Sequence, residues 1–209
     1  MQYIELREQL KNFIVFSLLD IKKIDPKFYG SRLNEWQVKG YIKKVRRGYY
    51  IFSDLELTED ILYLIANRLY EPSYVSLEIA LNHYNLIPEG VYQITSVSSK
   101  LPKSFETQIG HFSYRQVKQE LFFGYELHKV NEQHYKIAEI EKAVLDYLYL
   151  NPTMSDRENF TEWRFDFDEF KQRADMQKFY RYLAIINSPS LNKRVNRFIK
   201  YMEGTNASS

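Results

Sequence analysis

Positively charged side chains are concentrated at the start of the chain, where they can neutralise the phosphates of a nucleic acid. Residues 1–53 contain eleven lysines and arginines against five acidic residues, a net charge of +6. Residues 54–90 carry one against seven, a net charge of −6, so the total of +2 for the 209 residues conceals the separation. Cations that meet phosphates release condensed counterions, which drives binding to a duplex. The first 53 residues are therefore a candidate DNA-binding unit, with a boundary predicted between Ser53 and Asp54.

The candidate contacts fall into two chemical groups. Lys27, Ser31 and Asn34 recur at spacings of four and three, so a helix would place them on one solvent-facing stripe that can reach base edges. The cations expected at phosphates or in the minor groove are Lys22, Lys23, Arg32, Lys43, Lys44, Arg46 and Arg47. Lys22 and Lys23 have an alternative role, because cations near the end of a helix also complement its dipole.

Three short helices are expected to position these side chains. They are predicted over residues 3–11, 17–23 and 26–39. Ser17 can cap the start of the second helix, Pro26 suits the first position of the third, and Gly40 can end it. The residues predicted to form the buried stripe of the third helix are Tyr29, Leu33 and Trp36.

A basic hairpin is expected directly after the third helix. Residues 41–45 and 49–52 are prone to form strands and flank Arg46-Arg47-Gly48, where glycine can adopt the positive φ of a tight turn. Three helices followed by a basic hairpin make a winged helix-turn-helix, which places one helix in the major groove of DNA. We therefore predict residues 1–53 to be a winged helix-turn-helix domain that binds double-stranded DNA.

The rest of the chain is predicted to be an α+β domain with a helical C-terminal extension. The α+β domain, residues 54–152, is expected to have helices at 59–70, 74–84 and 138–149, and strands at 91–97, 107–114, 121–129 and 133–137. The extension, residues 153–203, is expected to have helices at 168–174, 176–186 and 190–202. Helices mixed with short neighbouring strands are typical of the α+β class. Residues 204–209 are predicted to be a disordered tail.

A group of acidic residues near the C-terminus is the strongest candidate for catalysis. Paired carboxylates can hold Mg²⁺ for the hydrolysis of phosphate esters. The group consists of Asp156, Glu158, Glu162, Asp166, Asp168 and Glu169. Basic residues alternate with these acids, as on a solvated helix, and the four histidines lack the spacing of metal ligands. The chain also has no cysteine and no glycine-rich phosphate motif.

These observations predict no catalytic residue, no metal site and no cofactor. Two alternatives to specific DNA binding remain open. One is a protein-interaction module whose basic first unit contacts an acidic protein, and the less favoured one is a metal-dependent nuclease. The sequence has no apolar stretch long enough to span a membrane and no signal peptide at its start. We therefore expect no membrane partner and a cytoplasmic, nucleoid-associated protein.

Several segments of the sequence share their residues, order and spacing with one family. They are residues 20–23, 33–42, 46–50, 71–81, 86–88, 105–114, 123–125 and 137–146. Together they resemble the AbiEi-type antitoxins, which are regulatory partners in bacterial type IV toxin–antitoxin systems. The resemblance extends over roughly residues 20–150.

The resemblance implies a transcriptional autorepressor that also counteracts a toxin. Its winged helix is expected to bind inverted repeats in the promoter of its own operon, and the remainder to oppose a nucleotidyltransferase-like toxin. Arg46 and Arg47 match the basic wing of the family, and Lys22 and Lys23 match its basic helix-turn-helix surface. The chain after Pro152 does not align with the family, which leaves open whether the toxin is opposed by direct contact.

Overall fold

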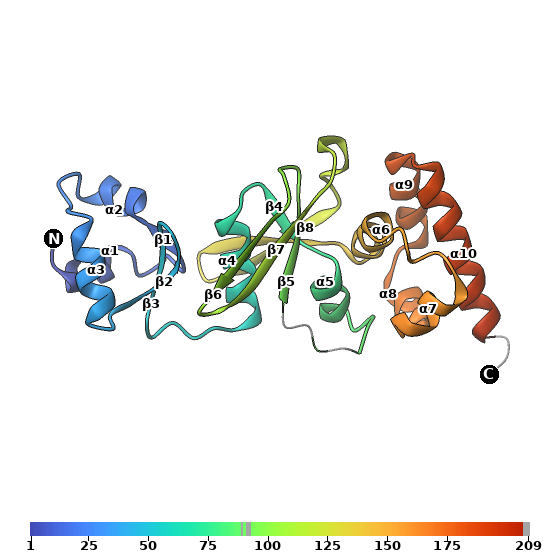
Figure 1. Ribbon diagram of the computed structural model, residues 1–209, viewed down its shortest axis with the longest axis horizontal. Helices are drawn as coiled ribbons and strands as arrows, with labels where there is room; N and C mark the ends of the chain where they lie inside the picture. The colour runs from blue at the N-terminus through green and yellow to red at the C-terminus, as the bar shows by residue number, and fades with distance from the viewer. Residues whose placement is uncertain (89, 91–92, 207–209) are drawn as a thin grey trace.

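The computed structural model describes residues 1–88, 90 and 93–206, and these form a mixed α+β fold with two separate sheets. Three parts follow one another along the longest axis: an N-terminal unit with a small sheet, a middle part built on a larger sheet, and a C-terminal group of helices (Figure 1). The predicted α+β class is confirmed.

The N-terminal unit combines three helices with the three strands of the small sheet. Its elements are α1 (Tyr3–Gln9), β1 (Phe16–Ser17), α2 (Leu18–Ile24), α3 (Ser31–Val38), β2 (Ile42–Arg46) and β3 (Tyr49–Phe52). The strands are antiparallel in the order β1-β3-β2. The Ser17 hydroxyl accepts a hydrogen bond from the Asp20 N–H, Gly40 follows α3 with a φ of 71°, and Gly48 turns the hairpin with a φ of 86°. The predicted cap, helix stop and hairpin turn are confirmed.

Helix α3 starts later than predicted. It begins at Ser31 rather than at Pro26, because Asp25 holds the intervening residues in a turn. The Asp25 carboxylate accepts a hydrogen bond of 3.0 Å from the Lys27 N–H, and its carbonyl accepts one of 3.0 Å from the Phe28 N–H. Such local bonds compete with helix formation. Lys27 therefore lies in the turn before α3 and not on the helix.

The later start changes which aromatic residue of this segment is buried. Phe28 points into the core with 5% of its surface exposed, whereas Tyr29 is 77% exposed. The predicted burial of Tyr29 is therefore wrong. Leu33 and Trp36 are buried as predicted, so the inward face of α3 is correct from its first turn onward.

The middle part is built on a six-stranded sheet. Its elements are α4 (Glu59–Leu69), β4 (Ser73–Val75), α5 (Glu78–His83), β5 (Gln93–Ser98), β6 (Lys103–Thr107), β7 (Gly110–Gln116), the short 3-10 helix η1 (Gln119–Leu121), β8 (Tyr125–Val130), β9 (Gln133–Ala138) and α6 (Ile140–Leu150). The strand order is β6-β7-β5-β4-β9-β8. Pairing is parallel between β5 and β7 and between β4 and β9, and antiparallel elsewhere.

Two strands of this sheet differ from the sequence prediction. Residues 73–75 form strand β4 instead of the start of a helix over 74–84, and α5 covers only 78–83. Strand β6 was not predicted. Strand β4 is completely buried between β5 and β9, so its conformation depends on partners distant in sequence rather than on its own residues. Of the strand predicted at 91–97, residues 93–97 lie in β5, and residues 91 and 92 lie outside the described residues.

In the part of the chain that the structure describes, four helices follow the sheet. They are α7 (Arg157–Trp163), which was not predicted, α8 (Phe167–Arg173), α9 (Met176–Ile186) and α10 (Pro189–Asn206). They share one apolar core with the middle part, and Trp163 stacks on Tyr147 of α6 with ring centres 4.6 Å apart. Residues 204–206 are helical rather than disordered, and residues 207–209 lie outside the described residues. Within the described ranges no helix has both the length and the apolar character required to cross a bilayer.

Candidate nucleic-acid interface

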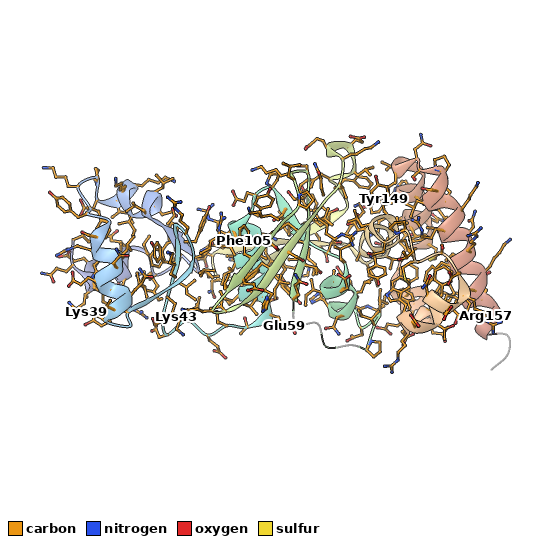
Figure 2. All side chains as sticks on the ribbon, viewed as in Figure 1. Lys39, Lys43, Glu59, Phe105, Tyr149 and Arg157 are labelled. Atoms are coloured by element: carbon orange, nitrogen blue, oxygen red, sulfur yellow. The ribbon has the colours of Figure 1, made fainter. Side chains whose placement is uncertain are left out.

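Most of the cations predicted to contact phosphates lie at the surface. The exposed ones are Lys22, Lys23, Lys43, Lys44 and Arg47, and Lys27, which was predicted to contact base edges, is exposed as well; Figure 2 shows Lys43 at the surface. Lys23 Nζ lies 3.8 Å from Asp20 Oδ1. None of the carboxylates that the structure describes lies within ion-pairing distance of the other five. These five cations are therefore available to an anionic partner.

One face of α3 is open to solvent. Its residues follow the spacing i, i+3, i+4 and i+7, which places them on a single stripe opposite the buried face. They are Ser31, Asn34, Glu35 and Val38. Glu35 is paired with Lys39, whose Nζ lies 2.6 Å away, and this hydrogen bond together with the charge of Lys39 lowers the pKa of the Glu35 carboxyl. Ser31 and Asn34 thus share an exposed face, as their spacing predicted.

The two half-buried arginines among the predicted DNA-contacting residues are held by contacts within the protein. The half-buried Arg32 donates a hydrogen bond from Nη1 to the carbonyl of Met1. The half-buried Arg46 lies between two rings, with its guanidinium carbon 4.6 Å from the ring centre of Tyr49 and 4.6 Å from that of Phe105 in β6. A β-bulge between Lys44 and Arg46 changes the register of the hairpin just before this contact. Arg47 is thus the exposed arginine of the turn.

Each face of the small sheet contributes side chains to an apolar core, which fixes the position of the hairpin. Ile42, Tyr50 and Phe52 pack against the N-terminal helices. Val45 and Ile51 belong instead to the apolar core of the middle part. Two polar contacts add to this junction: a hydrogen bond of 2.5 Å from Gln133 Nε2 to the Asn12 carbonyl, and an ion pair of 3.5 Å between Arg68 and Asp20. The N-terminal unit is therefore packed onto the middle part and not joined to it by a free linker.

Tyr29 and Val38 are exposed beside the predicted DNA-contacting residues, and the sequence did not lead us to predict either of them as a contact. Val38 is 90% exposed and lies one helical turn after Asn34. Its spacing from Ser31 and Asn34 therefore indicates that it lies on the same exposed face. Tyr29 had no comparable signal, because its exposure depends on the turn that Asp25 stabilises.

Apart from the exposed cations, a group of four polar side chains is completely buried between β4 and α6. Lys142 Nζ donates to the Tyr74 hydroxyl at 2.8 Å and forms an ion pair with Asp146. Asp146 Oδ2 also accepts from the Tyr74 hydroxyl at 2.8 Å and from the Ser76 hydroxyl at 3.0 Å. Burial, and then the charge of Asp146, raise the pKa of Tyr74 well above its usual value. All four residues are at most 2% exposed, so the group stabilises the fold and cannot reach a substrate.

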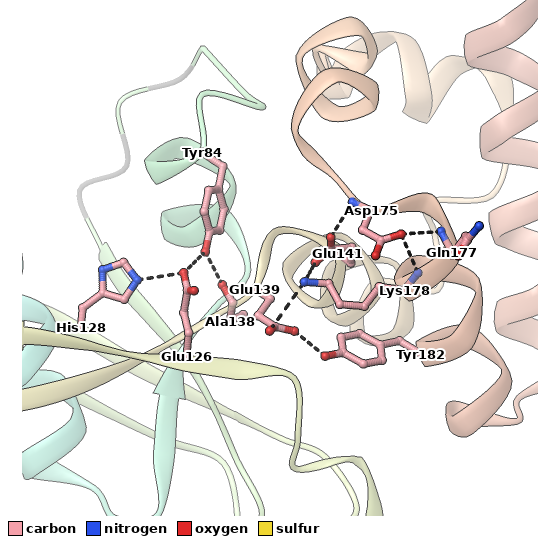
Figure 3. A network of polar contacts seen from close by, with 10 residues as sticks. All are labelled: Tyr84, Glu126, His128, Ala138, Glu139, Glu141, Asp175, Gln177, Lys178 and Tyr182. Carbon is pink, nitrogen blue, oxygen red and sulfur yellow. Dashed lines mark hydrogen bonds and ion pairs between the residues drawn. The ribbon is translucent and has the colours of Figure 1, made fainter.

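Another group of polar side chains connects the middle sheet to α9 (Figure 3). Lys178 lies 3.0 Å from Glu141 Oε2 and 3.6 Å from Glu139 Oε1, and Tyr182 donates to Glu139 Oε2. Partial burial opposes the charge of Lys178, but its pairing with Glu141 and Glu139 raises its pKa. Burial and the bond to Glu139 raise the pKa of Tyr182 to about 12. The carbonyl of Ala138, the residue before Glu139, accepts from the Tyr84 hydroxyl, which also lies 3.2 Å from Glu126, and Glu126 contacts His128. The arrangement is therefore a polar junction between the start of α6 and α9.

The acidic residues near the C-terminus are dispersed along α7, α8 and the loops before them. Asp156 caps α7 by accepting from the Asn159 N–H at 3.0 Å, and Asp166 caps α8 by accepting from the Glu169 N–H at 2.9 Å. Capping is a structural role. The described residues contain no group of three or more acidic, histidine or cysteine side chains arranged to hold a metal ion.

No protein family with an established sequence model matches the chain, and no curated protein is similar to it.

Proposed function

We propose that this protein is a DNA-binding autorepressor and antitoxin of the AbiEi type, in which residues 1–53 act as a winged helix-turn-helix. The observation that carries the proposal is the arrangement of the N-terminal unit. Helices α2 and α3 are joined by a tight turn and followed by the hairpin β2–β3, and α3 has an open polar face. A helix of this kind fits the major groove, and cations beside it meet phosphates.

The exposed residues divide into base-facing and phosphate-facing groups. Ser31 and Asn34 on α3 face the base edges, and Tyr29 lies next to them at the start of the helix. The phosphate-facing residues are Lys22, Lys23, Lys43, Lys44 and Arg47. Lys27, which was predicted to contact base edges, joins this group because it lies in the turn before α3 and not on the helix. Arg32 and Arg46 support the interface indirectly, because their guanidinium groups are held by Met1 and by Phe105.

Titration of the full-length protein against fluorescently labelled duplexes tests this proposal. One duplex carries the region upstream of the protein's own reading frame, and the control carries the same bases in scrambled order. We expect binding to the upstream duplex that is at least tenfold tighter, and a logarithm of affinity that falls linearly with the logarithm of salt concentration. A protein-interaction module predicts no preference between the two duplexes, and that result would reject the proposal.

The antitoxin part of the proposal rests on the resemblance to AbiEi-type antitoxins, and two of the segments that carry the resemblance meet in the fold. Tyr74 and Ser76 come from the segment 71–81, and Lys142 and Asp146 from the segment 137–146, and the four form one buried group. Two of the segments that carry the resemblance therefore meet in the interior of the middle part. We infer a nucleotidyltransferase-like toxin as the second partner, and a cytoplasmic location at the nucleoid.

Co-expression with the neighbouring reading frame tests the antitoxin activity. The candidate toxin is induced from an unrelated promoter, so that repression of its own promoter cannot protect the cells. We expect growth arrest with the toxin alone and growth when this protein is produced as well. Equal arrest in both cultures would contradict the antitoxin activity and leave DNA binding to be judged separately.

A further inference from the structure

The open face of α3 has no basic side chain that is free to contact a base. Residues 31–39 contain two basic residues, Arg32 and Lys39. Arg32 is half-buried and donates to the Met1 carbonyl, and Lys39 is paired with Glu35 at 2.6 Å. Guanine is read in the major groove mainly by bidentate contacts from arginine or lysine. Helix α3 therefore has no unpaired basic side chain for a bidentate contact with guanine.

The same face carries an amide and an apolar side chain one turn apart. Asn34 and Val38 occupy positions i and i+4, which brings their Cβ atoms to about 5–6 Å from each other. The Asn34 amide nitrogen has no partner among the described residues, and its oxygen accepts one long hydrogen bond of 3.4 Å from Gln37. Val38 exposes 90% of its surface to solvent.

These two side chains have complementary partners on an A·T pair. An asparagine amide can donate to N7 and accept from the N6 amino group of adenine, and an aliphatic side chain packs against the 5-methyl group of thymine. Val38 would bury its exposed apolar surface in that contact, which is favourable. Glu35, beside them, could accept from the amino group of cytosine or adenine, but it is paired with Lys39 at 2.6 Å and cannot donate to the acceptors of guanine.

We propose that Asn34 and Val38 read neighbouring A·T pairs, so that the half-site under α3 is selected for A·T. This specificity rests on the proposed function of DNA binding. The class of sequence that the N-terminal unit recognises would then be an A·T-rich half-site.

Selection from a library of duplexes with a randomised half-site gives the first test. We expect the full-length protein to enrich two or more adjacent A·T pairs. A selected half-site with G·C pairs at those positions would overturn the proposal.

Base analogues in the selected duplex give the second test. Uracil in place of thymine removes the 5-methyl group, and 7-deazaadenine in place of adenine removes the N7 acceptor. We expect each analogue to weaken binding of the unmodified protein about fivefold or more at the contacted pair.

The variants Val38→Ala and Asn34→Ala serve as controls for each other. Val38→Ala should reduce the sensitivity to uracil and keep that to 7-deazaadenine, and Asn34→Ala should reduce the sensitivity to 7-deazaadenine and keep that to uracil. Both residues are exposed, so folding is retained. Specific binding that is indifferent to both analogues would overturn this inference alone. Absence of any preference for the upstream duplex would overturn the proposed function, and this inference with it.

Discussion

The guanidinium carbon of Arg46 lies 4.6 Å from the centre of the Phe105 ring, and the two residues belong to different sheets. Arg46 ends β2 in the N-terminal unit, and Phe105 lies in the edge strand β6 of the middle part. The contact holds the hairpin against the middle sheet, and Figure 2 shows where Phe105 lies. The orientation of α3 relative to the rest of the molecule is therefore set by packing between the two sheets.

A double-mutant cycle measures this contact. Arg46→Ala and Phe105→Ala should each lower the free energy of unfolding, and the two effects should be coupled by about 1 kcal/mol, because a cation held over a ring contributes about 0.5–2 kcal/mol. Urea unfolding of the four proteins gives the coupling. Arg47→Ala combined with Phe105→Ala is the control, and its effects should add. Additive effects for Arg46 and Phe105 would show that the contact contributes nothing.

The two arginines at the hairpin turn should differ in how they affect DNA binding. Arg47→Ala removes an exposed cation and should shallow the slope of log affinity against log salt by about 1. Arg46→Ala should weaken binding through the position of the hairpin and leave the slope unchanged. Titrations at four or five salt concentrations separate the two cases. A change of slope for Arg46→Ala would place that residue at a phosphate.

The ion pair between Lys142 and Asp146 should be essential to the stability of the middle part. Asp146→Ala leaves a buried ammonium group without its charge partner and should lower the free energy of unfolding by about 3–5 kcal/mol. The double variant Lys142→Met with Asp146→Leu should recover a large part of that loss, because no buried charge remains. Urea unfolding tests both variants. Equal losses in the single and the double variant would contradict the assignment of the loss to an unpaired charge.

Stability should fall at alkaline pH, partly through Tyr182. The pKa of Tyr182 is raised to about 12, against about 10 in the unfolded chain. Above pH 10 the unfolded chain loses this proton while the folded protein keeps it, so the free energy of unfolding decreases as the pH rises from about 10 to about 12. Below pH 10 this group adds no pH dependence. Burial raises the pKa of Tyr84 as well, so it acts in the same direction.

Urea unfolding at several pH values between 9 and 11.5 measures this decrease, and Tyr182→Phe should make it less steep. Tyr180→Phe is the matched control, because it removes a tyrosine hydroxyl at an exposed position of the same helix. An identical pH dependence in the Tyr182→Phe variant would contradict the role of Tyr182.

Local signals in the sequence determined several features of the protein. Ser17 with Asp20 caps α2, Gly40 ends α3, and Gly48 turns the hairpin, because each depends on bonds or backbone angles within a few residues. The spacing of Ser31 and Asn34 likewise predicted their shared exposed face, since a helix imposes that geometry on any sequence.

Tertiary structure decided the features that depend on residues far apart in the chain. The position of Arg46 beside the hairpin turn predicts an arginine that is free to contact DNA. Phe105, 59 positions later in the chain, instead gives it a partner inside the protein. Strand β4 is extended because β5 and β9 bond to it on both sides, and Tyr74 in it is paired with Asp146 in α6. Side-chain partners of this kind are chosen by packing and by the burial of charge, which no local pattern specifies.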